Sequence, residues 1–166
     1  MHGDEDEAFG ALLHDVVEDG GGRPALDEIE ATYGSAVARM VLDNSDWVGD
    51  PDSKPRWYER KQAYLDSFPD KPPSSLRVCL ADKLHNARSI LLDYRTDGDA
   101  LWARFGQGQG LATRVYYREL AAAFERERGR VGAAAEPFVD ELRRVVDAIT
   151  ALAETLQGPD RRIGFP

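Results

Sequence analysis

The segment Ala11–Gly20 reads ALLHDVVEDG and holds four ionisable side chains close together: His14, Asp15, Glu18 and Asp19. Imidazole and carboxylate groups are ligands that a divalent transition-metal ion accepts. A carboxylate pair one turn further on can orient or deprotonate a water molecule. On a helix of 3.6 residues per turn, the four side chains fall within one arc of roughly 140°. A solvated polar face would show the same pattern, so both interpretations stay open for this segment alone.

A second set of polar residues interrupts the mostly apolar segment Cys79–Ile90, which reads CLADKLHNARSI. Asp82 lies among leucine and alanine neighbours, so we expect its carboxylate to be partly buried. Burying a carboxylate is costly unless it is paired or bound to a metal, and a hydrogen-bonded core aspartate is the simpler alternative. If the two polar stripes face each other, His14, Asp15 and Asp82 would supply three ligands to one ion.

These two motifs, LLHDVVED followed by LADKLHNARSI, resemble the HD-domain superfamily of metal-dependent phosphohydrolases. The similarity is greatest to the Rel/SpoT-type branch, which removes the 3′-pyrophosphate of the alarmone guanosine tetraphosphate (ppGpp). The intervening EIEATYGSAVARMV and the later ALWARFGQGQG and VYYRELAAAF also resemble that branch. The resemblance therefore extends over roughly residues 4–124.

The resemblance implies a function and a role for each matching residue. It implies a divalent metal cofactor, manganese in this branch, and a small nucleotide as the substrate. The alternative is a binding module for a nucleotide or a partner protein, with an incomplete metal site and no turnover. The matching positions are His14, Asp15 and Asp82 for the metal, Glu18 and Asp19 for catalysis, and Asn86 and Ser89 for substrate binding.

The sequence departs from the family before its first motif. The family's metal site begins with another histidine on a preceding helix, but only thirteen residues precede His14 here. We do not assign the missing role to His2. Either the sequence lacks the family's first helix, or the protein is a short form with a depleted site. A missing helix would leave apolar surface uncovered, which favours aggregation or pairing with another copy in a homodimer.

Two basic residues between the motifs, Arg60 and Lys61, are further candidates for substrate binding. They lie in a segment with Trp57, Tyr58 and Tyr64, and basic groups beside aromatic rings can hold a phosphate and stack a base. The alternative is a surface helix whose aromatic residues pack inward and whose basic residues pair with acids.

The elements that must position these residues are all predicted to be helices. Apolar residues recur at helical spacing, while Gly, Pro and Asp clusters mark the breaks. We therefore expect an all-α, single-domain bundle of the HD type over residues 1–157, without the family's first helix, and a disordered tail over 158–166. The predicted helices cover residues 4–19, 25–33, 35–43, 56–68, 74–95, 100–105, 110–128 and 134–157.

Composition excludes several functional classes. The 166 residues carry a formal net charge of −9, which argues against binding to a nucleic acid polymer, because phosphates need a basic surface. No apolar run approaches the ~20 residues of a membrane span, and no signal peptide opens the chain. We therefore expect a cytoplasmic protein that does not bind membranes. The single cysteine, Cys79, rules out an internal disulfide.

Overall fold

Helices account for the regular structure throughout residues 4–49, 51–105 and 109–157, which are the residues that the computed structural model describes. No strand occurs in these ranges, so the prediction of an all-α fold is confirmed. None of the helices found there is long and apolar enough to cross a membrane. The predicted tail, residues 158–166, lies outside the described residues. The main helices are α1 (Glu5–Leu13), α2 (Gly22–Tyr33), α3 (Ser35–Asn44), α4 (Trp57–Asp66), α5 (Pro73–Asp97), α6 (Gln109–Arg126), α7 (Arg128–Val131) and α8 (Glu136–Gln157).

The N-terminal helix is shorter than the sequence pattern predicted. Helix α1 ends at Leu13, and after a turn the chain winds again as a π-helical segment, Val17–Gly21, that leads directly into α2. The prediction of one helix over residues 4–19, with four ionisable groups on a single arc, was therefore wrong. The apolar spacing continues through Val16 and Val17, so it does not mark the break at His14.

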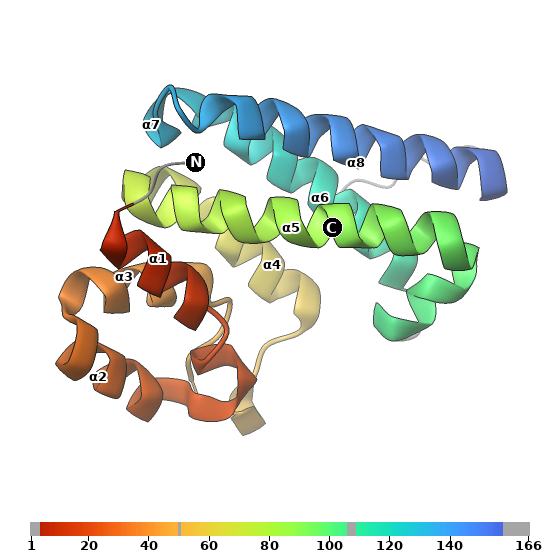
Figure 1. Cartoon of the computed structure of the whole chain (residues 1–166). Helices are drawn as coiled ribbons and strands as arrows, with labels where there is room; N and C mark the ends of the chain where they lie inside the picture. The colour runs from red at the N-terminus through yellow and green to blue at the C-terminus, as the bar shows by residue number, and fades with distance from the viewer. Residues whose placement is uncertain (1–3, 50, 106–108, 158–166) are drawn as a thin grey trace.

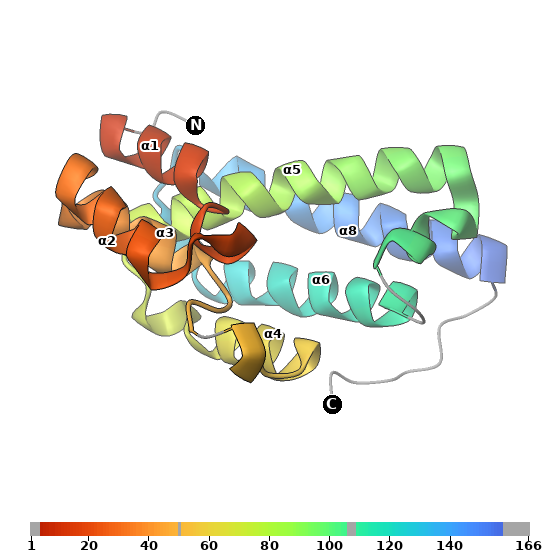
Figure 2. The same cartoon turned by 90° about the horizontal axis from the view of Figure 1, so that it is seen from below.

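The core consists of two groups of buried side chains. The smaller group, which we call the N-terminal cluster, lies between α1, α2 and α3 and includes Val17, Leu26, Val37, Val41 and Val78. The larger group, the C-terminal cluster, lies between α4, α5, α6 and α8. Figure 1 shows α1–α3 gathered beside the N-terminal part of α5, with α8 running along the same helix. The view in Figure 2 shows α4 and α6 on the far side of α5 from α1.

Helix α5 contributes to both clusters and carries the second motif. It begins with Pro73 at its first position, where a missing backbone N–H costs nothing. Val78 packs into the N-terminal cluster, whereas Leu80 and Leu84 pack into the C-terminal cluster. This double role places Asp82 where the two groups of helices meet.

Candidate functional site

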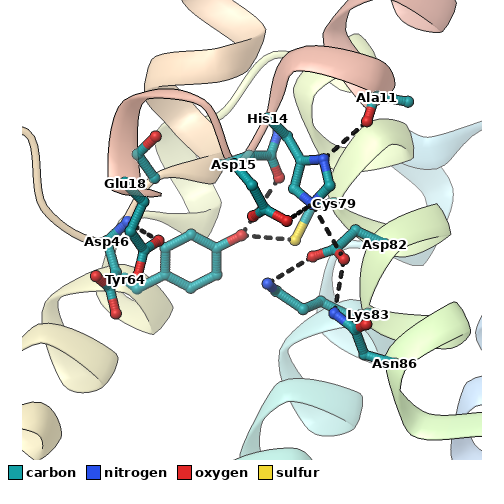
Figure 3. Close-up of polar contacts among 12 residues, drawn as sticks. Ala11, His14, Asp15, Glu18, Asp46, Tyr64, Cys79, Asp82, Lys83 and Asn86 are labelled. Atoms are coloured by element: carbon teal, nitrogen blue, oxygen red, sulfur yellow. Dashed lines mark hydrogen bonds and ion pairs between the residues drawn. The ribbon is translucent and has the colours of Figure 1, made fainter. Parts of the chain in front are cut away.

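The imidazole of His14 points from the end of α1 toward the carboxylate of Asp82 on α5 (Figure 3). Its Nδ1 atom donates a hydrogen bond to the carbonyl oxygen of Ala11 at 2.7 Å. In the neutral ring this bond assigns the proton to Nδ1 and leaves the lone pair on Nε2. The Nε2 atom lies 3.3 Å from Oδ1 of Asp82 and 3.1 Å from Oδ2 of Asp15. The structure thus brings together the three predicted metal ligands.

The Nε2 atom of His14 faces both carboxylates. The atom is buried and has no partner with hydrogen-bond geometry among the described residues. No group of three or more His, Cys, Asp and Glu side chains in the described ranges forms a ready-made metal site. However, a nitrogen lone pair flanked by two carboxylates is a donor set that suits a divalent cation. The Asp15 side chain is 64% exposed, so it is free to adjust its position.

The carboxylate of Asp82 is 8% exposed and is held by its own helix. Asn86 donates to Oδ1 at 2.7 Å, and the ammonium group of Lys83 lies 2.6 Å from Oδ2. Burial by itself would raise the pKa of Asp82, but His14 and Lys83 lower it to about 2. The same contact with Asp82 raises the pKa of His14, against the effect of burial. Asp82 is therefore ionised at neutral pH, as a metal ligand must be.

The second predicted function, proton transfer, involves Glu18 on the π-helical segment. Its Oε2 atom accepts a hydrogen bond of 3.5 Å from the backbone N–H of Asp46, in the loop after α3. Burial raises the pKa of Glu18, and the negative charge of Asp46 raises it further. A raised pKa makes a carboxylate a better proton acceptor. The side chain of Asp19, the other predicted catalytic residue, lies outside the described part of the structure.

The predicted substrate-binding residues Arg60 and Lys61 both contact Asp46. The Nε atom of Arg60 lies 3.2 Å from Oδ1, and the Nζ atom of Lys61 lies 2.6 Å from Oδ2. The Asp46 side chain is 2% exposed. The sequence left two interpretations of these basic residues open. The contacts match the one in which the basic residues pair with an acid. Asp46 could not be predicted from the sequence, because it lies in a loop rich in Asp, Gly and Pro that has no periodic pattern.

A buried tyrosine lies between the two parts of the site (Figure 3). The hydroxyl of Tyr64 donates to Oδ1 of Asn44 at 3.3 Å and lies 2.8 Å from Sγ of Cys79. Burial raises the pKa of Tyr64 well above its usual value. This phenol is thus neutral and fixed, and it connects α3, α4 and α5 beneath the site.

Two cavities adjoin these residues. One of about 530 Å³ has Glu18, Trp47 and two basic residues, Arg23 and Lys54, in its wall. Another of about 260 Å³ is lined by Asn86, Ser89, Phe105 and Tyr117, with further neighbours. The predicted substrate-binding pair Asn86 and Ser89 therefore faces one common space. The hydroxyl of Ser89 donates to its own helix, at the carbonyl of His85.

Comparison with known proteins matches the chain to a family. Residues 1–112 match the model of the HD domain. Over 80 residues the chain is 40% identical to guanosine-3′,5′-bis(diphosphate) 3′-pyrophosphohydrolase MESH1 of Homo sapiens, and equally to the protein of that name from Mus musculus. The alignment covers 48% of this chain and 41% of each relative. The matched region contains His14, Asp15 and Asp82, and the chain belongs to the HD-domain family.

Proposed function

We propose that the chain is a metal-dependent phosphohydrolase that cleaves a phosphoester or pyrophosphate bond of a nucleotide. The observation that carries this proposal is the Nε2 atom of His14, which is buried and faces the carboxylates of Asp15 and Asp82. The two MESH1 relatives are named for removing a 3′-pyrophosphate from guanosine-3′,5′-bis(diphosphate). That nucleotide, ppGpp, is therefore the first substrate to test.

In this proposal His14, Asp15 and Asp82 hold one divalent ion, with Mn²⁺ as the expected metal. The mixed set of one nitrogen and two carboxylates suits manganese. A divalent ion in such a site supplies electrophilic polarisation of a phosphoryl oxygen and makes water easier to deprotonate. Asn86 orients the Asp82 carboxylate through its 2.7 Å hydrogen bond, which is the usual role of a polar neighbour behind a metal ligand.

Proton transfer is assigned to Glu18, together with the predicted Asp19. Hydrolysis forms a new P–O bond to the oxygen of water and breaks the P–O bond to the leaving group. Water loses a proton in this step, and the leaving oxygen gains one if it is to depart as a hydroxyl. A carboxylate such as Glu18, whose pKa is raised by burial and by Asp46, is able to accept the first proton and return it.

The substrate contacts are assigned to the two cavities. Asn86 and Ser89 would bind the nucleotide from the smaller cavity. Arg23 and Lys54 in the wall of the larger one supply positive charge for phosphates on a chain that is otherwise acidic. Direct phosphate contact by Arg60 and Lys61 stays a prediction, because both already contact Asp46.

We expect the protein to be cytoplasmic and to bind a small nucleotide. We also expect it to self-associate. The side chain of Leu12, at the end of α1, is 78% exposed, and Val16 nearby is 40% exposed. Apolar side chains at such positions are compatible with a homodimer.

Replacement of Asp82 by alanine tests the proposal. Asp82→Ala removes an ionised ligand, so we expect it to abolish both Mn²⁺ binding and Mn²⁺-dependent hydrolysis of ppGpp. Calorimetry and a pyrophosphate-release assay measure the two effects, and circular dichroism checks the fold. The matched control is Asp66→Ala, because Asp66 is an exposed carboxylate on α4 that lines neither cavity. Full activity of Asp82→Ala would contradict the proposal.

A second candidate function is a nucleotide-binding module without turnover. The ammonium group of Lys83 lies 2.6 Å from the carboxylate that would bind the ion, and this contact favours the second candidate. Burial by itself would lower the pKa of Lys83, but the nearby Tyr116 and Asp82 raise it, so the cation persists. Metal analysis of the purified protein, followed by Mn²⁺-dependent assays on ppGpp and simpler nucleotides, separates the two functions. Binding of a nucleotide without turnover at saturating Mn²⁺ would favour the module.

A further inference from the structure

The Asp46 carboxylate is almost fully enclosed and is held by two cations. It is 2% exposed, and Arg60 and Lys61 contact one oxygen each, at 3.2 and 2.6 Å. Arg60 is fixed in turn by a hydrogen bond of 2.8 Å to the carbonyl of Pro55. An enclosed carboxylate is tolerated only when it is paired in this way. The orientation of Asp46 is therefore determined by α4 and by the loop that precedes it.

The same residue contacts Glu18 through its backbone. The backbone N–H of Asp46 donates to Oε2 of Glu18 at 3.5 Å, across a separation of 28 positions in the sequence. Glu18 belongs to the π-helical segment, so this hydrogen bond joins that segment to the loop after α3. Through its backbone N–H and its carboxylate, Asp46 thus links the π-helical segment to α4.

We propose that Asp46 is a positioning residue for Glu18, because its backbone N–H binds the Glu18 carboxylate while its own carboxylate pairs with Lys61 and Arg60. The inference rests on the proposed function only in calling Glu18 catalytic. Without Asp46, the two cations would be free to pair with Glu18 directly and to neutralise the group that accepts the proton.

The charges around Glu18 predict how the removal of Asp46 or of Lys61 should change the pKa of Glu18. Burial and the negative charge of Asp46 raise the pKa of Glu18, while the positive charge of Lys61 lowers it. Burial by itself would raise the pKa of Asp46, but Lys61, Glu18 and Arg60 together lower it. Arg23 and Lys54 line the same cavity as Glu18, and both are left unchanged in the experiment. Removing Asp46 or Lys61 should therefore move the pKa of Glu18 in opposite directions.

The test is a carbon-detected NMR titration of the Glu18 carboxyl in the metal-free protein, without substrate. We expect Asp46→Asn to lower the pKa of Glu18 and Lys61→Gln to raise it. The control is Asp66→Asn, because Asp66 is exposed on α4 and bonds only to Gln62 among the described residues. This control should leave the titration of Glu18 unchanged.

The pH profile of ppGpp hydrolysis provides the second measurement. One limb of the profile should be absent in Glu18→Gln. That limb should move to lower pH in Asp46→Asn and to higher pH in Lys61→Gln. Asp46→Glu should restore part of the activity that Asp46→Asn loses. A purely structural role would reduce activity without opposite shifts. Equal titration of Glu18 in all variants, or shifts in the same direction, would overturn the inference. Because the titration needs no turnover, opposite NMR shifts with no hydrolysis would reject the proposed function alone.

Discussion

The tautomer of His14 follows from a single contact, and it defines what the site can bind. Because Nδ1 donates to the Ala11 carbonyl, only Nε2 remains to bind a proton or a metal ion. Asp82 is close enough to stabilise either of them. Metal and proton therefore compete for the same nitrogen, as is general for histidine ligands.

The ionised state of Asp82 predicts a pH-dependent contribution to stability. Its pKa falls from 3.8 to about 2 in the folded protein. The folded state therefore binds fewer protons, and the stabilisation is complete above about pH 4 and is lost as the pH falls toward 2. In the metal-free protein, Asp82→Asn should lower the free energy of unfolding by about 2 kcal/mol at pH 7. Urea unfolding over a pH series measures this difference, which should vanish near pH 2.

The comparison for that prediction is Asp93→Asn on the same helix. Asp93 pairs with Arg104, but both side chains are well exposed, so the loss should stay below about 1 kcal/mol. A loss for Asp82→Asn that does not change with pH would mean that the effect comes from packing rather than from charge.

At the scale of elements, the π-helical segment Val17–Gly21 determines how the two motif halves are separated. His14 and Asp15 lie in the turn before it, and Glu18 lies within it. The wider turn of a π-helix turns Glu18 toward Asp46 rather than toward Asp82. The proposed metal ligand His14 therefore contacts α5, whereas the proposed proton-transfer residue Glu18 contacts the loop after α3.

The segment depends on a glycine at its end. A Cβ atom added at Gly21 would lie 2.3 Å from Cβ of Ala25 and 2.9 Å from the carbonyl oxygen of Val16. We expect Gly21→Ala to destabilise the protein by about 1–3 kcal/mol, because the backbone must move to relieve the overlap. Thermal unfolding is the measurement.

A matched glycine serves as its control. A Cβ atom at Gly129, on α7, would meet nothing within 4 Å. Gly129→Ala should therefore be neutral or stabilise the protein by about 0.5–1 kcal/mol, since alanine favours the helix. Equal effects of both substitutions would show that the overlap at Gly21 is relieved without cost.

The helices and half of the site could be predicted from the sequence, for identifiable reasons. Apolar spacing identifies a helix wherever one face is buried, and the motif around Asp82 predicted a partner for His14 that the structure provides. The end of α1 could not be predicted, because Val16 continues the apolar pattern although it is 40% exposed. Asp46 was missed because its role comes from Glu18 and Lys61, which are distant in the sequence.

For the whole molecule, the site lies where the N-terminal and C-terminal clusters meet. His14 and Asp15 follow α1, which belongs to the N-terminal group of helices, whereas Asp82 lies on α5. The N-terminal cluster is the smaller of the two. Because it buries less apolar surface, we expect it to open locally at a lower free energy than the C-terminal cluster does.

An ion held by His14, Asp15 and Asp82 would stabilise this boundary. We expect Mn²⁺ to slow amide hydrogen exchange in α1–α3 more than in α6 and α8, because a ligand that binds only the closed state stabilises it. Hydrogen-exchange mass spectrometry with and without Mn²⁺ measures the difference. Asp82→Ala should remove it, and a uniform slowing across all helices would contradict the expectation.

The position of the site between two clusters of unequal size also bears on the lifetime of the protein in a cell. Proteases cleave chains that open locally, and the rate follows the population of the open state. On the proposed function, the ion that activates the enzyme would also protect α1–α3 from cleavage. Metal starvation would then reduce the amount of the protein as well as its activity, so that nutritional supply of the metal would control both.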